Sequence, residues 1–265
     1  MDAETALRQG CLDEALQLTE SRIRQDPAEL KPRIFLFQLL TIQGRWERAL
    51  RQLKTIGELD PATLAMAWCY RNAIQCEILR EKVFRGESSP SVFGDPSEWT
   101  ALLIEALKCT ARGKPEEGAR LRRQAFEQAP AAAGTLDGRA FQWIADADSR
   151  IGPMLELMID GRYGWTPFEA IAELHIDQPT DLRDMVWIPV HVHWRNGGQS
   201  HALMPSRYPF SYRREDSLLA LSRKTEWENC GDEFYLGYGQ RMWTTEQTEY
   251  PLLQCRHLQM QVETA

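Results

Sequence analysis

The first half of the chain repeats a pattern of apolar and small residues with helical spacing. The stretch QGCLDEAL at 9–16 returns as QGRWERAL at 43–50, so that Gly44 follows Gly10 by 34 residues. In each unit a small residue stands five positions after the glycine, and a proline follows twelve positions later. The copies are Gly10, Ala15 and Pro27; Gly44, Ala49 and Pro61; and, with a weaker match, Gly113, Gly118 and Pro130.

This period is typical of stacked helical hairpins of the tetratricopeptide (TPR) type. The glycine would lie in the turn between two helices, the small residue would let them approach closely, and the proline would end the second helix. Further helices are predicted at 62–84 and 98–113, with a loop at 85–98 between them. Residues 1–135 are therefore predicted to form a TPR-like α-α superhelix, which would offer a concave binding surface.

Later in the chain the pattern changes to short alternating stretches. In WIPVHVHW at 187–194, Ile188, Val190, Val192 and Trp194 share one side of a predicted strand. The following RNGGQ is a hairpin-turn signal, which predicts a return strand at 200–208. Further strands are expected within 233–246 and 250–262.

The apolar stretch at 151–160, before these strands, does not alternate. Pro153 near the start and Gly161 after the end of an apolar run favour a short helix at 151–160. The next stretch, 166–171, fits either a capped helix or a strand. We predict that 136–265 is an α+β domain with mostly antiparallel β structure, in a small sheet or barrel.

Composition narrows the class of protein. The 265 residues are 43% hydrophobic and carry a net charge of −7, which gives no general attraction to nucleic acid or anionic lipid. The N-terminus does not resemble a secretory signal, and the apolar run at 34–40 is too short to span a bilayer. The six cysteines form no C-x-x-C pair, so we expect free thiols in a cytoplasmic protein.

The acids of WIADADSR, Asp146 and Asp148, form an Asp-x-Asp that can hold a metal ion or tie a structure together. An EF-hand is excluded, because Ile151 and Leu157 stand where its glycine and glutamate would be. We therefore favour ion pairs with arginines over a metal site. Candidate partners are Arg150, Arg162 and Arg183.

Histidines supply the other candidate ligands. His191 and His193 share one side of the predicted strand, and His201 would join them only in one of two hairpin registers. Since two placed ligands fall short of the three or four that a metal needs, we predict no metal and no cofactor. The sequence also lacks a phosphate loop, a nucleophile elbow and a His-Glu-x-x-His motif, so we predict no enzyme. The alternative is a metal-dependent hydrolase that uses Asp146, Asp148, His191 and His193.

Several long motifs resemble one known family. The run DGRAFQWIADADSRIGPMLELMIDGRYGWTPF at 137–168 resembles the signature of the ImpE/SciE family, also called TagJ. The chain departs from the pattern expected for the family at Ser91–Asp95 and at Gly164, where a larger residue is expected. The other matching stretches are GRWERALRQL, PTDLRDMVWIP, MPSRYPFS, LSRKTEW and GYGQRMW.

The resemblance implies a non-enzymatic accessory protein of the bacterial type VI secretion system, without a membrane or nucleic-acid partner. It would bind TssB, the small subunit of the contractile sheath, through an amphipathic helix. It would thereby help the ATPase ClpV to engage and recycle contracted sheath in the cytoplasm.

Two sets of residues follow from this reading. Aromatic and arginine side chains are frequent interface anchors, so the candidate partner-binding residues are Arg162, Tyr163, Trp165, Arg183 and Trp187. The second set forms a structural junction between the two halves. Asp146, Asp148 and Arg150 would supply its ion pairs, with Trp143 packed beneath them.

Overall fold

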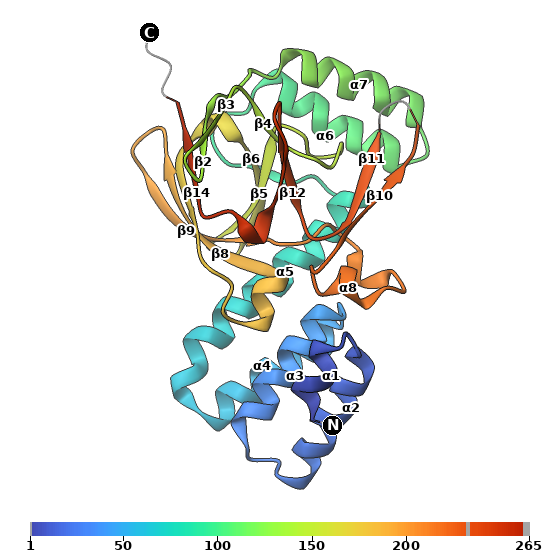
Figure 1. The fold of residues 1–265 in the computed structure, drawn as a ribbon, viewed down its shortest axis with the longest axis vertical. Coiled ribbons are helices and arrows are strands. Elements are labelled where there is room, and N and C mark those ends of the chain that lie inside the picture. Colours follow the sequence, from blue (N-terminus) through green and yellow to red (C-terminus); the bar gives the residue numbers. More distant parts are fainter. Residues whose placement is uncertain (1, 232–233, 262–265) are drawn as a thin grey trace.

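The protein consists of helices followed by a β-rich part, as a computed structural model of residues 2–231 and 234–261 shows (Figure 1). Helices α1 to α4 form a lobe at one end of the molecule, and α5 runs from this lobe to the strands. The helices are α1 (Ala3–Arg8), α2 (Leu12–Gln25), α3 (Leu30–Ile42), α4 (Trp46–Leu59), α5 (Leu64–Phe84), α6 (Glu98–Ala111), α7 (Pro115–Gln128) and the short α8 (Ser217–Ala220).

The predicted hairpin turns are confirmed. Gly10, Gly44 and Gly113 follow α1, α3 and α6 with φ of 80°, 64° and 77°, a backbone conformation that glycine adopts without steric cost. The small residues allow close packing: a Cβ on Gly118 would come within 2.2 Å of Thr110 Oγ1 on the facing helix. Gly118 therefore serves helix packing although it is a poor helix former.

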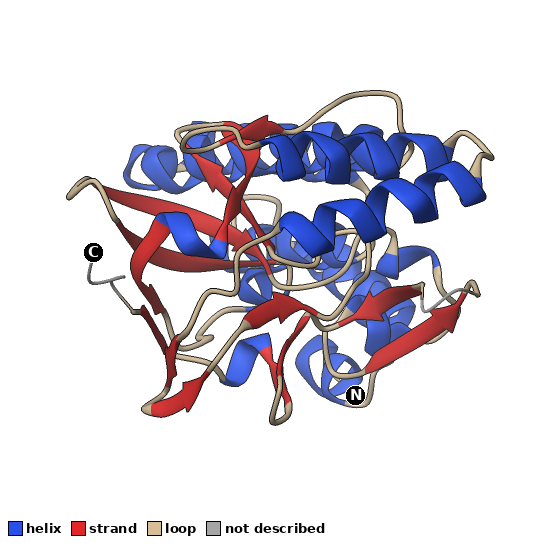
Figure 2. Ribbon diagram, turned by 90° about the horizontal axis from the view of Figure 1, so that it is seen from above, coloured by secondary structure: helices blue, strands red, loops and turns tan. Residues whose placement is uncertain are grey.

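The hairpins do not form one continuous array. Helix α5, 21 residues long, separates α1–α4 from the α6–α7 hairpin, which lies at the opposite end of the molecule (Figure 1). Seen from above, long helices lie beside the strands (Figure 2). The expected TPR-like superhelix over 1–135 is therefore not confirmed. The period of 34 residues is lost where α5 leaves the stack of hairpins and crosses to the strands.

The β part is larger than predicted. Among the described residues the main sheet has the order β1-β6-β5-β9-β8-β7-β14-β2-β3, and a smaller sheet has the order β13-β12-β4. The main sheet is antiparallel apart from the β1–β6 pair and remains open between its edge strands β1 and β3, so it is neither small nor a barrel. The strands are β1 (Ser91–Val92), β2 (Gly134–Leu136), β3 (Arg139–Phe141), β4 (Ile144–Asp146), β5 (Met154–Ile159), β6 (Arg162–Pro167), β7 (Ile171–Ile176), β8 (Trp187–Trp194), β9 (Gln199–Pro205), β10 (Thr225–Asn229), β11 (Tyr235–Gly239), β12 (Met242–Thr245), β13 (Glu249–Pro251) and β14 (His257–Met260).

The predicted hairpin at 187–208 is confirmed as β8 and β9. The helix predicted at 151–160 is wrong, because this segment is strand β5. Every residue of β5 is buried, with Met154 and Met158 facing the helices and Leu155 and Leu157 facing the smaller sheet. A strand that is buried on both faces lacks alternation and cannot be told from a buried helix by its pattern.

The other strand predictions hold in part. The region 166–171 contains the end of β6, a 3-10 turn and the start of β7. The stretch 233–246 contains β11 and β12, and 250–262 contains β14. Residues 233 and 262 lie outside the described residues.

The two places where the sequence departs from the family pattern are neighbours in space. Ser91 in β1 pairs with Gly164 in β6, and Phe93 N donates a hydrogen bond to Trp165 O over 2.8 Å. A Cβ on Gly164 would lie 2.7 Å from the Phe93 ring and 2.8 Å from Ser91 O. Glycine at 164 thus gives the 91–93 segment room to add a strand to the sheet edge.

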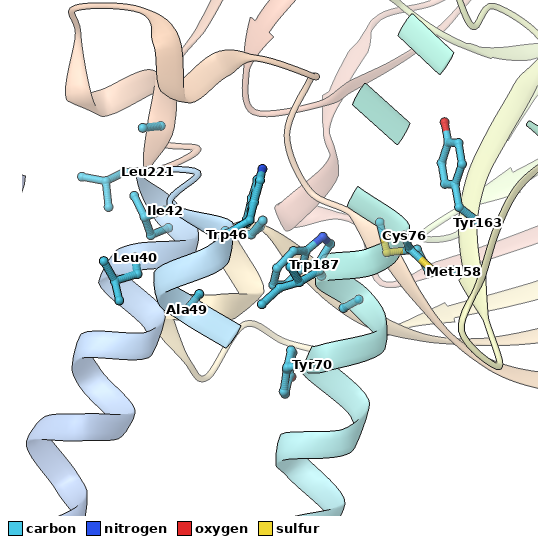
Figure 3. Packing of buried hydrophobic residues seen from close by; sticks show 14 of the residues in the cluster. Leu40, Ile42, Trp46, Ala49, Tyr70, Cys76, Met158, Tyr163, Trp187 and Leu221 are labelled. Carbon is cyan, nitrogen blue, oxygen red and sulfur yellow. The ribbon is translucent and has the colours of Figure 1, made fainter. Parts of the chain in front are cut away.

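A hydrophobic cluster joins the helical lobe to the sheet. It contains residues from each of α1 to α8 together with Met158, Tyr163, Trp165 and Trp187 from the strands. Figure 3 shows part of this cluster, including Trp46, Tyr70 and Trp187. The Trp187 ring lies 5.9 Å from that of Trp46 and 6.2 Å from that of Tyr70. None of the helices in the described part of the chain has the length and apolar composition needed to cross a membrane.

Candidate functional site

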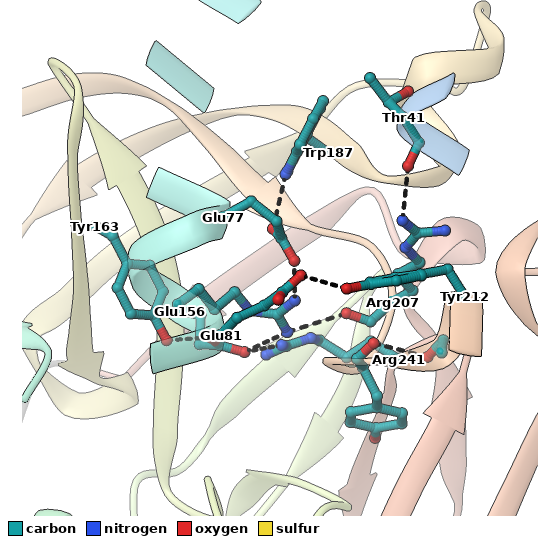
Figure 4. Close-up of polar contacts among 12 residues, drawn as sticks. Thr41, Glu77, Glu81, Glu156, Tyr163, Trp187, Arg207, Tyr212 and Arg241 are labelled. Carbon is teal, nitrogen blue, oxygen red and sulfur yellow. Dashed lines mark hydrogen bonds and ion pairs between the residues drawn. The ribbon is translucent and has the colours of Figure 1, made fainter. Parts of the chain in front are cut away.

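Helix α5 carries charged side chains into the interior where it meets the sheet (Figure 4). Arg80 Nε donates to Glu156 Oε1 over 2.7 Å, and Arg80 Nη1 donates to Glu77 Oε1 over 2.9 Å. Glu156 also accepts hydrogen bonds from Arg241 and from the Tyr163 hydroxyl. The ion pairs across the boundary between helices and strands therefore centre on Glu156, which the sequence analysis did not single out.

The charges of this network are set by burial and by its arginines. Burial alone would raise the pKa of Glu156, but Arg80 and Arg241 outweigh it and lower the pKa to about 2. Burial raises the pKa of Asp146 to about 7, although Arg241 opposes the shift. Glu156 therefore stays ionised between two guanidinium groups, and it joins Arg80 of α5 to Arg241 of the β part.

The predicted junction residues lie close to this network but are arranged differently. Asp146 accepts from Arg241 Nη1 over 3.0 Å, and Asp148 accepts from Arg150 Nε over 2.8 Å and from Gly237 N over 2.8 Å. The Arg150 guanidinium also lies over the Phe84 ring of α5, 4.9 Å from its centroid. Trp143 is 38% exposed, so it does not pack beneath the ion pairs as predicted.

The loop after β9 binds the ends of helices in the lobe. Buried Arg207 donates to Thr41 O over 2.9 Å and to Ile42 O over 2.7 Å at the end of α3. Arg223 donates to Leu7 O over 3.1 Å at the end of α1. A cation at a helix C-terminus complements both the free carbonyls and the helix dipole. These contacts fix the lobe relative to the sheet.

The structure buries most of the predicted partner-binding residues. Tyr163 is 1% exposed, and Trp165 and Trp187 have no exposed surface. Since side chains without exposed surface cannot contact a partner in this conformation, the prediction needs correction for these three residues. Arg162 is exposed on β6, and half-buried Arg183 lies 4.5 Å from the centroid of the Tyr70 ring.

The described surface instead shows an apolar groove between α4 and α5. Its volume is about 570 Å³, and its floor is formed by Leu50, Leu53, Leu64, Ala67 and Trp68. Trp68 is 65% exposed, and Leu64 is exposed beside it. The polar residues along the groove are Arg51, Lys54, Glu58, Arg71 and Gln75.

A second hollow of about 440 Å³ lies on the other side of Trp68, between α5 and the sheet. Cys69 and Cys76 of α5 line it, opposite His191 and His201 of the β8–β9 hairpin. Burial raises the pKa of Cys76 to about 12, which keeps this thiol protonated and unreactive. Neither Cys69 nor Cys76 forms a disulfide in this structure.

The residues of the alternative, a metal-dependent hydrolase, do not come together in one site. Asp146 lies on β4 of the smaller sheet, where Arg241 occupies its carboxylate, and Asp148 in the next turn is occupied by Arg150. His191 and His193 lie on β8 of the main sheet, on the side that faces away from its core with the smaller sheet. The two aspartates are thus engaged in structural ion pairs.

Comparison with known proteins decides the family. The family model described as "ImpE protein" matches residues 138–259. A protein from Pseudomonas aeruginosa, named "Type VI secretion system accessory component TagJ", is 44% identical over 97% of this chain and 90% of its own length. The chain belongs to the ImpE family. The family prediction made from the sequence is confirmed.

The fold of this ImpE protein is also similar to a solved structure. The crystal structure of protein VPA1032 from Vibrio parahaemolyticus is 28% identical in sequence and has a TM-score of 0.90. The match covers 99% of this chain and 98% of the other. The arrangement of lobe, α5 and sheet is therefore shared along the whole length of the two proteins.

Two features of this ImpE protein were not predicted from its sequence. The groove residue Trp68 lies in the run LAMAWCY, whose apolar residues surround the helix, so that some of them must face solvent wherever α5 leaves the core. The charged residues Glu77, Arg80 and Glu81 follow in the same helix. Charges within such an apolar helix are a signal for a buried ionic network.

Proposed function

We propose that this protein is an adaptor of the bacterial type VI secretion system that holds an amphipathic helix of TssB in the groove between α4 and α5. The exposed apolar floor around Trp68 carries the proposal. Large apolar side chains that stay exposed beside a groove mark interaction sites, and tryptophan is a frequent anchor at interfaces. The name of the Pseudomonas aeruginosa relative supports a role in the type VI secretion system.

The groove suits a helix in both shape and charge. Helix α4 has 14 residues and is therefore about 21 Å long, which matches several turns of a bound helix. Along the groove Arg51, Lys54 and Arg71 outnumber the acid Glu58. The bound helix would accordingly place apolar side chains on the floor and acidic side chains against these three cations.

The adaptor role extends to sheath recycling. A protein that holds TssB would mark sheath subunits for the ATPase ClpV, whether or not it touches ClpV itself. Sheath recycling takes place in the cytoplasm, and the adaptor needs neither catalytic activity nor a cofactor for this role. Of the partner-binding residues predicted from the sequence, exposed Arg162 remains a peripheral candidate, because its neighbour Gly161 lines the hollow beside Trp68.

Titration calorimetry against the cognate TssB, intact and without its N-terminal helix, tests the proposal. We expect saturable binding to the intact subunit only. Trp68→Ala should weaken binding by ~2 kcal/mol or more, because it removes the central anchor. Trp143→Ala is the matched control, since Trp143 is also an exposed tryptophan but lies in the β part. If both variants bind TssB as tightly as the wild type, the adaptor role stands but the groove between α4 and α5 is not the binding site.

The charges can be tested separately. Lys54→Glu and Arg71→Glu should slow association and reduce its dependence on salt, because both cations flank the groove. Lys108→Glu on α6 is a control for a general change in net charge, since Lys108 does not line the groove. Absence of binding to intact TssB would reject the proposed function as a whole.

A further inference from the structure

All five histidines of the chain lie on one side of the main sheet. The strand register places His201, His191, His175 and His257 in a row across β9, β8, β7 and β14. In the adjacent row His193 of β8 lies opposite Glu173 of β7. Their strand neighbours Leu174, Val192 and Leu258 are buried in the core on the opposite side of the sheet.

Glu173, in the adjacent row, lies close to three of these histidines. Its Oε1 lies 2.6 Å from His257 Nε2 and 3.1 Å from His175 Nε2, and its Oε2 lies 3.8 Å from His193 Nδ1. The side chains of Glu173, His175 and His193 are between 30% and 48% exposed, so solvent and solutes can reach their polar atoms. Ligand atoms of these three residues all lie within 4.8 Å of one another.

We propose that Glu173, His175 and His193 form a binding site for a divalent transition-metal ion of the zinc type. Two imidazole nitrogens and one carboxylate oxygen are ligands that such an ion accepts, with a fourth position left for water or a partner's ligand. Tetrahedral ligands at the usual zinc distances stand roughly 3.3 Å apart, so small side-chain rotations close the site. The site is not visible in the sequence, because Glu173 and His175 lie on β7 and His193 lies on the neighbouring strand β8.

The surroundings of Glu173 support a ligand role. A carboxylate cannot donate, so His257 donates to Oε1 and leaves Oε2 free to face His193. His257 is thus a positioning residue, which holds the carboxylate in place as outer-shell partners of metal ligands do.

The test is a titration of the full chain with Zn²⁺, with Mg²⁺ as an ion that prefers oxygen ligands. We expect one Zn²⁺ per chain and no saturable Mg²⁺ binding. Glu173→Gln, His175→Ala and His193→Ala should each weaken Zn²⁺ binding by ~100-fold or more, beyond the 10–100-fold typical of outer-shell partners. His201→Ala is the matched control, because it removes an exposed imidazole at the far end of the same row.

Two results would overturn the proposal. One is the absence of saturable Zn²⁺ binding to a folded chain. The other is binding that survives Glu173→Gln or that weakens equally in His201→Ala, as expected for adventitious capture by exposed imidazoles. Circular dichroism verifies the fold of each variant, and Glu173→Gln keeps an oxygen acceptor for His257. Cobalt(II) as a replacement ion gives a second readout, since the intense visible absorption of a tetrahedral site should disappear in the same three variants.

Discussion

Arg80 Nε donates a hydrogen bond to Glu156 Oε1 over 2.7 Å, although 76 positions separate the two residues in the chain. Both side chains are almost completely buried. The bond joins helix α5, which leaves the helical lobe, to strand β5 in the interior of the main sheet. Its energetic role can be measured directly, because each partner can be replaced without a change in the surface of the protein.

Arg80→Met should lower the free energy of unfolding by ~3–5 kcal/mol, because it leaves buried Glu77 without its cation and leaves Glu156 with Arg241 alone. Urea unfolding followed by tryptophan fluorescence measures the effect. Arg22→Met is the control, since Arg22 forms an exposed pair with Glu29 and such pairs add little to stability. Equal midpoints for the two variants would contradict a structural role of the Arg80–Glu156 pair.

The low pKa of Glu156 predicts a dependence of stability on pH. Burial opposes ionisation, but Arg80 and Arg241 lower the pKa from 4.5 to about 2 in the folded protein. This group therefore stabilises the fold fully above pH 4.5, and its contribution is lost as the pH falls towards 2, by up to ~1.4 kcal/mol per pH unit. Glu156→Gln should lack this part of the slope when unfolding is measured between pH 7 and pH 3.

Gly44 should tolerate alanine less well than Gly113 does. Both have positive φ, but a Cβ on Gly44 would lie 2.5 Å from the Tyr212 ring, whereas nothing lies within 4 Å of the same position at Gly113. Gly113→Ala should cost only the backbone strain of ~1 kcal/mol. Gly44→Ala should cost clearly more, and thermal unfolding of the two variants should show the difference. Equal melting temperatures would mean that Tyr212 moves aside freely.

Asp148→Ala should be strongly destabilising. Asp148 has no exposed surface, and it accepts hydrogen bonds from the Arg150 side chain and from Gly237 N. Its removal leaves a buried guanidinium and a buried amide without their acceptor, at a cost of ~3 kcal/mol or more. A melting temperature equal to that of the wild type would refute a structural role for this residue.

Features that depend on neighbouring residues were predictable from the sequence. The hairpin turns at Gly10 and Gly44, and the β8–β9 hairpin with its turn at 195–199, are local and carry glycine at the positions that need it. The prediction of a helix at 151–160 was wrong because both faces of strand β5 are covered. Covering elements come from distant parts of the chain, so the local pattern cannot show them.

The prediction of partner-binding residues was wrong for the same reason. Trp165 and Trp187 were expected to anchor a partner, but helix α5 and the lobe cover both of them. Trp68 has the same chemistry and stays exposed, and only the packing of α4 against α5 distinguishes it. The group around Glu173 requires the pairing of His257 with His175, which are 82 residues apart and lie on neighbouring strands of the sheet.

Helix α5 carries Trp68 at the groove and Arg80 at the sheet, twelve residues or about 18 Å apart along the same axis. Because a helix is stiff along its axis, the angle between a captured segment and the sheet is set by the protein. An adaptor built in this way would hold its bound partner in a defined orientation relative to the sheet, which a flexible linker would not do. The adaptor would then determine the orientation of its bound partner as well as the affinity of binding.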